Sequence, residues 1–121
     1  MGLFINLSNH PSKNWNQEQL AAAEKFGKII DYQFPVVSPY STELEINELA
    51  ERIVAEISAL MPSAVMCQGE YTLCFALVMK LKALGIKVVA SCSDRVTVEE
   101  QKGNDTIKTA VFKFIRFREY L

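Results

Sequence analysis

Short apolar runs alternate along the chain with longer segments in which apolar residues recur every three or four positions. The apolar runs at residues 3–7, 64–67 and 86–90 have the length of strands buried on both faces. Residues 29–34 alternate enough to predict a further strand, which Pro35 ends. The longer segments have the periodicity of helices with one buried face, and they lie between Gln17 and Gly27, between Thr42 and Pro62, and between Glu70 and Gly85. The pattern therefore predicts alternating strands and helices up to residue 90.

Polar residues mark the starts of these helices. Asn14 or Asn16 can cap the first helix, and Thr42 with Glu45 forms a T-x-x-E capping box for the second. Such a box satisfies backbone N–H groups that a helix leaves without partners at its start. The helices are therefore predicted from local hydrogen bonding as well as from periodicity.

After residue 90 the pattern changes to one of strands alone. Ser91–Arg95 is polar and is expected to leave the fourth strand as a loop. Val96–Val98 and Ile107–Phe117 then predict strands, and the Gly/Asn/Asp link Lys102–Asp105 indicates a hairpin between them. The whole chain, residues 1–121, thus predicts one α/β domain, a Rossmann-like three-layer sandwich. We expect a parallel sheet of order 2-1-3-4, with a C-terminal β-hairpin that extends or covers its far edge.

In that strand order the chain reverses direction between strands 1 and 3, and ligands of open α/β sheets bind at such a switch, beyond the carboxyl ends of the strands. The loops expected there are Ser8–Pro11, Gln68–Glu70 and Ser91–Arg95. All three are polar, and the stretch from Asn6 to Trp15 also contains the chain's single His and single Trp. We therefore expect a binding pocket where these loops meet.

The composition narrows the possible ligands and partners. The net charge is −1, with 13 basic and 14 acidic side chains, which argues against a partner such as long nucleic acid. No apolar run is long enough for a membrane span and no signal peptide is evident, so we expect a protein that does not bind membranes. Three cysteines without paired spacing are expected to be buried free thiols, and such an odd set suits a cytoplasmic protein. One His and scattered carboxylates make no ligand set, so neither a metal nor a cofactor is expected.

The expected pocket combines neutral polar groups with one cation. Helix N-termini near Gln17 and Glu70 would favour an anion, and Gly69 would allow close approach to the backbone. Arg95 can form paired hydrogen bonds with a phosphate, whereas Trp15 or Tyr71 can stack on a base. Walker and dinucleotide-binding glycine motifs are absent. A phosphorylated nucleotide fits these groups better than an apolar ligand does.

Three motifs in the chain resemble a known family. They are N-L-S-N-H-P-S followed by Trp15, then Q-G-E-x-T from Gln68, and S-C-S-x-R from Ser91. In this order they resemble the CRISPR-associated ring nucleases, small stand-alone proteins of type III CRISPR systems. The resemblance extends over nearly the whole chain, to Phe112–Phe117.

The resemblance implies a Rossmann-like homodimer that binds cyclic tetra-adenylate on its two-fold axis. Such proteins cleave the ring to linear di-adenylate with a 2′,3′-cyclic phosphate, without a metal, and so switch off the antiviral response. Two alternatives stay open: a protein that sequesters the same messenger without cutting it, and a flavodoxin-like domain for another nucleotide or for protein interaction.

Chemistry assigns candidate roles to individual residues, each beside a structural alternative. The candidate catalytic residues are His10, Ser8 and Asn9, and the candidate ligand-binding residues are Asn6, Trp15, Gln68, Gly69, Glu70, Ser91, Ser93 and Arg95. His10 can act as acid or base, or can simply bond the backbone. Ser8 and Asn9 can hold phosphate or form a turn. Asn6 interrupts an apolar strand and needs a partner, which a ligand or a neighbouring loop can supply. The alternatives for the remaining charged and aromatic candidates are that Glu70 complements the dipole of the third helix, that Arg95 forms an ion pair with Asp94 or Glu99, and that Trp15 covers the core or forms a dimer contact.

Overall fold

Five strands form one sheet in the computed structural model, which describes residues 2–121. The strands are β1 (Leu3–Ser8), β2 (Lys28–Gln33), β3 (Ala64–Cys67), β4 (Val88–Lys102) and β5 (Asp105–Glu119). Their order is β2-β1-β3-β4-β5, parallel from β2 to β4, with β5 antiparallel to β4. The predicted α/β class, the order 2-1-3-4 and the C-terminal hairpin are therefore confirmed.

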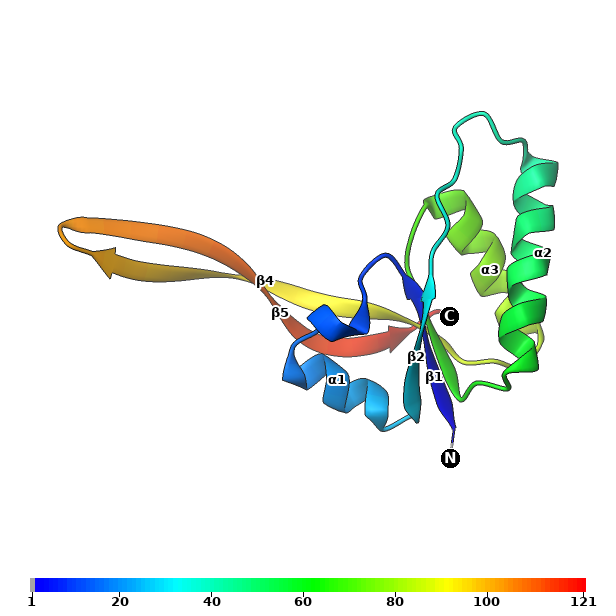
Figure 1. Cartoon of the computed structure of the whole chain (residues 1–121), viewed down its shortest axis with the longest axis horizontal. Helices are drawn as coiled ribbons and strands as arrows, with labels where there is room; N and C mark the ends of the chain where they lie inside the picture. The colour runs from blue at the N-terminus through cyan, green and yellow to red at the C-terminus, as the bar shows by residue number, and fades with distance from the viewer. Residues whose placement is uncertain (1) are drawn as a thin grey trace.

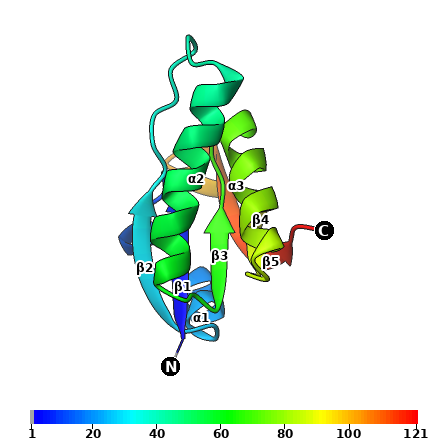
Figure 2. The same cartoon turned by 90° about the vertical axis from the view of Figure 1, so that its right-hand side faces the viewer.

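Helices cover both faces of this sheet (Figure 1). The helices are α1 (Gln17–Glu24), α2 (Glu43–Ala59) and α3 (Tyr71–Ala83), and a short 3-10 helix, η1 (Ser12–Asn14), precedes α1. Helix α1 lies on one face, and α2 and α3 lie together on the other, where Figure 2 shows them side by side. None of the helices within residues 2–121 combines the length and the apolar composition needed to cross a membrane.

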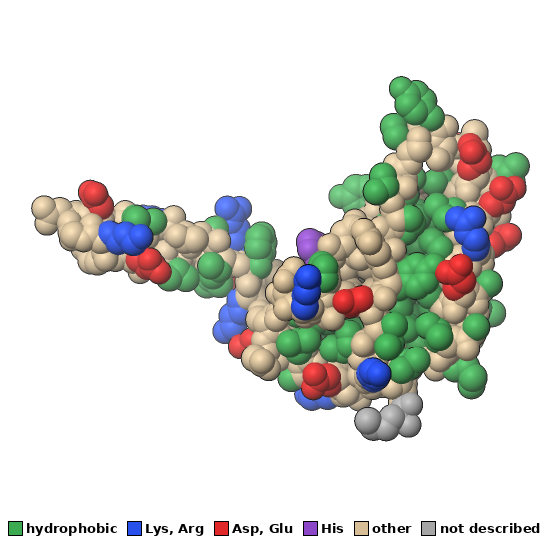
Figure 3. Space-filling model, in the orientation of Figure 1, with side chains coloured by type: hydrophobic (Ala, Val, Ile, Leu, Met, Phe, Trp, Pro, Cys, Tyr) green, Lys and Arg blue, Asp and Glu red, His purple; other side chains and the backbone are tan. Residues whose placement is uncertain are grey.

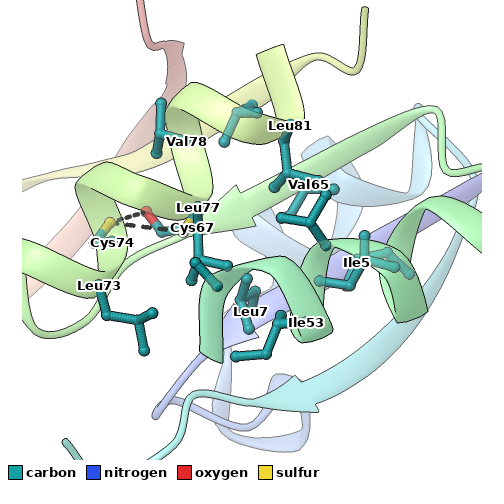
Figure 4. Packing of buried hydrophobic residues seen from close by; sticks show 14 of the residues in the cluster. Ile5, Leu7, Ile53, Val65, Cys67, Leu73, Cys74, Leu77, Val78 and Leu81 are labelled. Carbon is teal, nitrogen blue, oxygen red and sulfur yellow. Dashed lines mark hydrogen bonds between the residues drawn. The ribbon is translucent and has the colours of Figure 1, made fainter. Parts of the chain in front are cut away.

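Alternate residues of the central strands build two hydrophobic cores. From β1, Ile5 and Leu7 face α2 and α3, whereas Phe4 faces α1. The larger core lies under α2 and α3, with Leu77 and Leu81 fully buried in it (Figure 4). A strand with apolar residues on both faces can only be central, which explains why β1 and β3 lie inside the sheet.

The predicted helix starts are confirmed. Asn16 caps α1 by accepting a hydrogen bond from the Gln19 N–H at 3.0 Å, so the cap is Asn16 rather than Asn14. Thr42 and Glu45 form the complete capping box of α2, with bonds of 2.9 and 3.2 Å. The backbone N–H of Thr42 also lowers the pKa of the Glu45 carboxyl.

The prediction that Ser91–Arg95 forms a loop after a strand ending at Ala90 is wrong. Strand β4 continues without a break from Val88 to Lys102, because β5 pairs with it over that whole length. One β-bulge between Cys92 and Ser93 is the only irregularity in the described pairing. The outer part of this hairpin, residues 93–113, projects from the body and is called the arm below (Figure 1).

The capping box generates a stability prediction. Thr42→Ala is expected to lower the free energy of unfolding by about 1 kcal/mol, because the first turn of α2 loses an acceptor for the Glu45 N–H. Urea unfolding followed by circular dichroism measures the change. Ser41→Ala, one position earlier and outside the box, is the matched control and should change stability by less than about 0.5 kcal/mol. Equal losses in both variants would refute the capping contribution.

Candidate functional site

A pocket of about 760 Å³ lies at the carboxyl ends of β1, β3 and β4, on the α1 side of the sheet. Its wall includes residues from all three predicted segments: Asn9 and His10 after β1, Gln68 after β3, and Ser91 and Ser93 in β4. Its volume lies within the range of about 300–1,000 Å³ that is usual for small-molecule sites. Segments far apart in the sequence therefore meet at the switch point of the sheet, as the strand order requires.

The loop after β1 is held from beneath by two buried polar side chains. Asn6 and Ser8 are 1% and 4% exposed. The Ser8 hydroxyl donates to Asn6 Oδ1 at 2.6 Å and accepts from the His10 N–H at 3.2 Å. Asn6 Nδ2 donates to the His10 carbonyl oxygen at 2.8 Å. The neighbouring loop thus satisfies Asn6, and neither Asn6 nor Ser8 lines the pocket.

Asp31 of β2 extends this network to η1. Its Oδ1 accepts from Asn6 Nδ2 at 3.0 Å, and its Oδ2 accepts from the Ser12 hydroxyl at 3.1 Å. Register places Asp31 directly beside Asn6 on the neighbouring strand. The carboxylate therefore ties β1, β2 and the loop into one rigid unit beside the pocket.

Trp15 holds the carboxyl-terminal end of the same loop. Its indole N–H donates to the His10 carbonyl oxygen at 3.1 Å. Its ring packs edge-on against Phe4, with the centroids 6.3 Å apart, and also contacts Phe117. Trp15 thus covers the smaller core while one part of it lines the pocket. The side chain of His10 stays exposed at the pocket wall (Figure 3).

The next two segments are joined by one hydrogen bond. Gln68 Oε1 accepts from the backbone N–H of Ser91 at 2.6 Å, which connects the end of β3 to β4. Both residues line the pocket and are partly buried. The side-chain amide of Gln68 has two donors in addition to this acceptor, so it can still bind a ligand.

Gly69 and Glu70 lie outside this pocket wall. The ring of Phe34 covers Gly69 so closely that an added Cβ would come within 2.5 Å of it. Glu70 caps α3, because its carboxylate accepts from the N–H groups of Thr72 and Leu73 at 3.0 and 2.8 Å, and these bonds lower its pKa. The expectation that the start of α3 offers N–H groups to an anion is therefore wrong for these two groups. Glu70 lines a second depression, with Glu43, on the opposite face.

Arg95 and Tyr71 lie at the margin of the site. Arg95 pairs with Phe112 across the hairpin, and Phe112 lines the pocket. Directly opposed residues share one face of a ribbon, so Arg95 lies on the pocket face just beyond the wall. Tyr71 is 90% exposed at the start of α3 and is not part of the wall.

Sequence reasoning missed six residues of the wall. They are Asn14, Asn16, Gln19, Met66, Phe112 and Phe114. Phe112 and Phe114 alternate with charged residues in the last strand, a period of two that indicates a shared face. That signal does not tell which other element the face meets. The bulge at Cys92 and Ser93 decides this by bringing Phe114 beside Phe117, at 4.9 Å between ring centroids.

A thiol pair lies behind the end of β3. Cys67 and Cys74 are buried and free, with their sulfur atoms 3.6 Å apart. The hydrogen bond between them lowers the pKa of Cys74 to about 7 and raises that of Cys67, whose burial acts in the same direction. The Tyr120 hydroxyl donates to the Cys67 carbonyl oxygen at 2.8 Å. Cys92 is partly exposed, so the expectation of three buried thiols is confirmed for two.

Comparison with known proteins identifies a family for this chain. The model of the Uncharacterized protein MJ1673 family matches residues 2–118, which is nearly the whole chain. No curated protein matches the chain.

The buried network generates a prediction that distinguishes a residue that stabilises the loop from a residue that only lines the pocket. Ser8→Ala is expected to lower the free energy of unfolding by about 1–3 kcal/mol, because Asn6 Oδ1 and the His10 N–H both lose a partner. Urea unfolding measures the loss. Ser93→Ala removes the same hydroxyl from an exposed position of the pocket wall and should leave stability within about 0.5 kcal/mol of the native chain. A fully stable Ser8→Ala variant would contradict the supporting role.

Proposed function

We propose a ring nuclease function for this chain, which belongs to the Uncharacterized protein MJ1673 family. In this proposal the protein binds cyclic tetra-adenylate and cleaves it, without a metal, to linear di-adenylate carrying a 2′,3′-cyclic phosphate. Removal of this messenger in the cytoplasm would end antiviral signalling by a type III CRISPR system.

The observation that carries the proposal is the meeting of three distant polar segments in one pocket wall. They contribute Asn9 and His10, Gln68, and Ser91 with Ser93. Their amides and hydroxyls offer the paired donors and acceptors that bind base edges and ribose hydroxyls. Trp15 and the 72% exposed Phe112 add aromatic surfaces on which adenine can stack. This combination suits a nucleotide better than an apolar ligand.

His10 is the residue to which the proposal assigns acid–base chemistry. The ribose 2′-oxygen attacks the adjacent phosphorus, its proton passes to a base, and the 5′-oxygen leaves with a proton. His10 is the one pocket-wall residue within 2–121 with an imidazole, a side chain that can both accept and donate a proton. Asn6 and Trp15 donate to its carbonyl oxygen and its N–H donates to Ser8, so the backbone of His10 is fixed and the imidazole projects from a rigid loop.

Phosphate contacts come from the margin of the pocket in this proposal. Arg95 lies on the pocket face of the hairpin and can form paired hydrogen bonds with a phosphodiester. The first N–H groups of α1 follow Asn16, itself a wall residue, and their dipole also favours an anion. A ring with four equivalent phosphates is best held by two copies of the chain across a two-fold axis, which gives each half-ring the same contacts.

Sequestration without cleavage is the second candidate, and it is favoured by the burial of Ser8, an expected catalytic residue, and of Asn6, an expected ligand-binding residue. Ser8 is buried and hydrogen-bonded, as is Asn6, so neither reaches a ligand in the pocket. The wall then has His10 alone for acid–base work. Incubating the protein with cyclic tetra-adenylate in EDTA and separating the products by chromatography distinguishes the candidates. Linear di-adenylate supports the nuclease, and tightly bound intact ring supports the sequestering protein.

His10→Ala is expected to slow cleavage by about 100-fold or more while changing the dissociation constant of the ring less than about threefold. Single-turnover cleavage and calorimetric titration measure the two quantities separately. Lys13→Ala, a charge removal in η1 outside the pocket wall, is the control and should cleave normally. Unchanged turnover in His10→Ala would remove His10 from the mechanism.

Arg95→Ala is expected to weaken ring binding by about tenfold, because a charge-assisted hydrogen bond to phosphate is lost. Its single-turnover rate at saturating ring should stay within about threefold of the native rate. Arg118→Ala removes an exposed arginine from the other end of the hairpin and serves as the control. Equal affinities for the two variants would exclude Arg95 from the phosphate contacts.

A further inference from the structure

The arm has no support from its own chain. Every residue from Ser93 to Lys113 is exposed, and its strands pair only with each other. Figure 1 shows it extending away from the body, on the side opposite α2. An isolated two-stranded ribbon is marginally stable in water unless a helix or another sheet packs against it. The arm therefore lacks a packing partner within the described chain.

The two faces of the arm differ in character. One face has Val96 opposite Val111, Val98 opposite Thr109 and Ile107 opposite Glu100, and the four apolar residues are each between 38% and 43% exposed. The other face, which includes Arg95, has a Lys108–Glu99 ion pair at 3.7 Å and a Thr106–Gln101 hydrogen bond at 3.2 Å. Figure 3 shows green apolar side chains along the arm. The apolar face is the one that needs to be covered.

The charge of the arm argues for a protein partner. Residues 93–113 contain four acidic and four basic side chains, so their net charge is zero. A polyanion or an anionic membrane surface would call for an excess of basic residues. Alternating charges around an apolar centre are typical of a contact between protein surfaces.

A second apolar surface without a partner lies on α3. Tyr71, Phe75 and Met79 are 90%, 68% and 54% exposed. They follow each other at intervals of four residues, so they form one stripe, roughly 12 Å long, on the helix. The apolar stretch from Ile107 to Val111 on the arm is about 14 Å long. The two surfaces match in length, and a helix on a β-ribbon is a common way to bury both.

The charges at one end of the two surfaces are complementary. On the apolar face of the arm, Lys113 lies opposite Asp94, so the base of that face is neutral, whereas Glu100 near the tip lies opposite the apolar Ile107. Lys80 lies near the carboxyl end of the α3 stripe, where it also pairs with Glu51 at 3.7 Å. An arm whose tip lies at the carboxyl end of α3 would place Glu100 near Lys80, and this charge pair sets the direction of the contact.

We propose that the arm packs with its apolar face on the Tyr71–Met79 stripe of a second copy, so that two copies exchange arms around a two-fold axis. The arm starts at the pocket, where Ser93 and Phe112 are wall residues. If two pockets face each other, each arm must run past the axis and along its neighbour. This contact would form the homodimer that the proposed function expects, but it needs no ligand. An experiment can therefore contradict the contact without contradicting the proposed function.

Sedimentation equilibrium of the full chain without ligand is the first test. The native chain is expected to be a dimer. Val98→Asp and Phe75→Asp should each weaken dimerisation by on the order of 100-fold or more, because either change buries a charge without a partner. Thr97→Asp adds the same charge to the polar face of the arm and should leave the dimer intact. All three positions are exposed, so circular dichroism should confirm native folding.

Cross-linking then tests which surfaces meet. Under mild oxidation, a mixture of Val98→Cys and Phe75→Cys chains should form a mixed disulfide, identified by mass spectrometry of the linked peptides. A disulfide between two Val98→Cys chains alone would show that arms pair with each other and would overturn the proposed contact. A monomeric native chain would overturn it as well. Ring binding, assayed separately, would still test the proposed function.

Discussion

The His10 carbonyl oxygen is the acceptor on which the pocket depends. Asn6 from within β1 and the indole of Trp15 both donate to it, so a strand and the segment before α1 meet at one atom. Asn6 is buried in an otherwise apolar strand, where a missing partner would be costly. The loop therefore has little freedom to adopt another conformation, and this constraint positions the side chain of His10.

Other polar groups near the switch point are also hydrogen-bonded within the chain. Glu70 holds the start of α3, and Gln68 holds β4 through the Ser91 N–H. These bonds stabilise the frame of the pocket, and they also reduce the number of groups that can bind a ligand. The remaining wall combines amides, hydroxyls and aromatic rings with a single imidazole. In the proposed function this wall binds a nucleotide, and the cleavage chemistry depends on His10.

For the arm, the local sequence pattern predicts the correct element, a hairpin, but not its length. The sequence predicts a hairpin, and Gly103 takes a positive φ of 62° at its turn. The polar run Ser91–Arg95 has the composition of a loop, but β5 pairs with it and keeps it extended. The amphipathic arm then has a face that the monomer does not bury. The length of the arm is set by the pairing of β4 with β5. Composition does not report this pairing, so it indicates a shorter strand.

The sequence by itself determined the α/β class, the strand order, the helix starts and the segments that supply the pocket. These features depend on periodicity, on capping groups and on the handedness of crossovers, all of which act locally or by general rule. Only the tertiary structure decided that Asn6 and Ser8 support the loop from below, that Glu70 caps a helix, and that Phe112 and Phe114 reach the wall. A polar side chain takes whichever partner the packed chain brings within about 3 Å, and sequence patterns do not encode that distance.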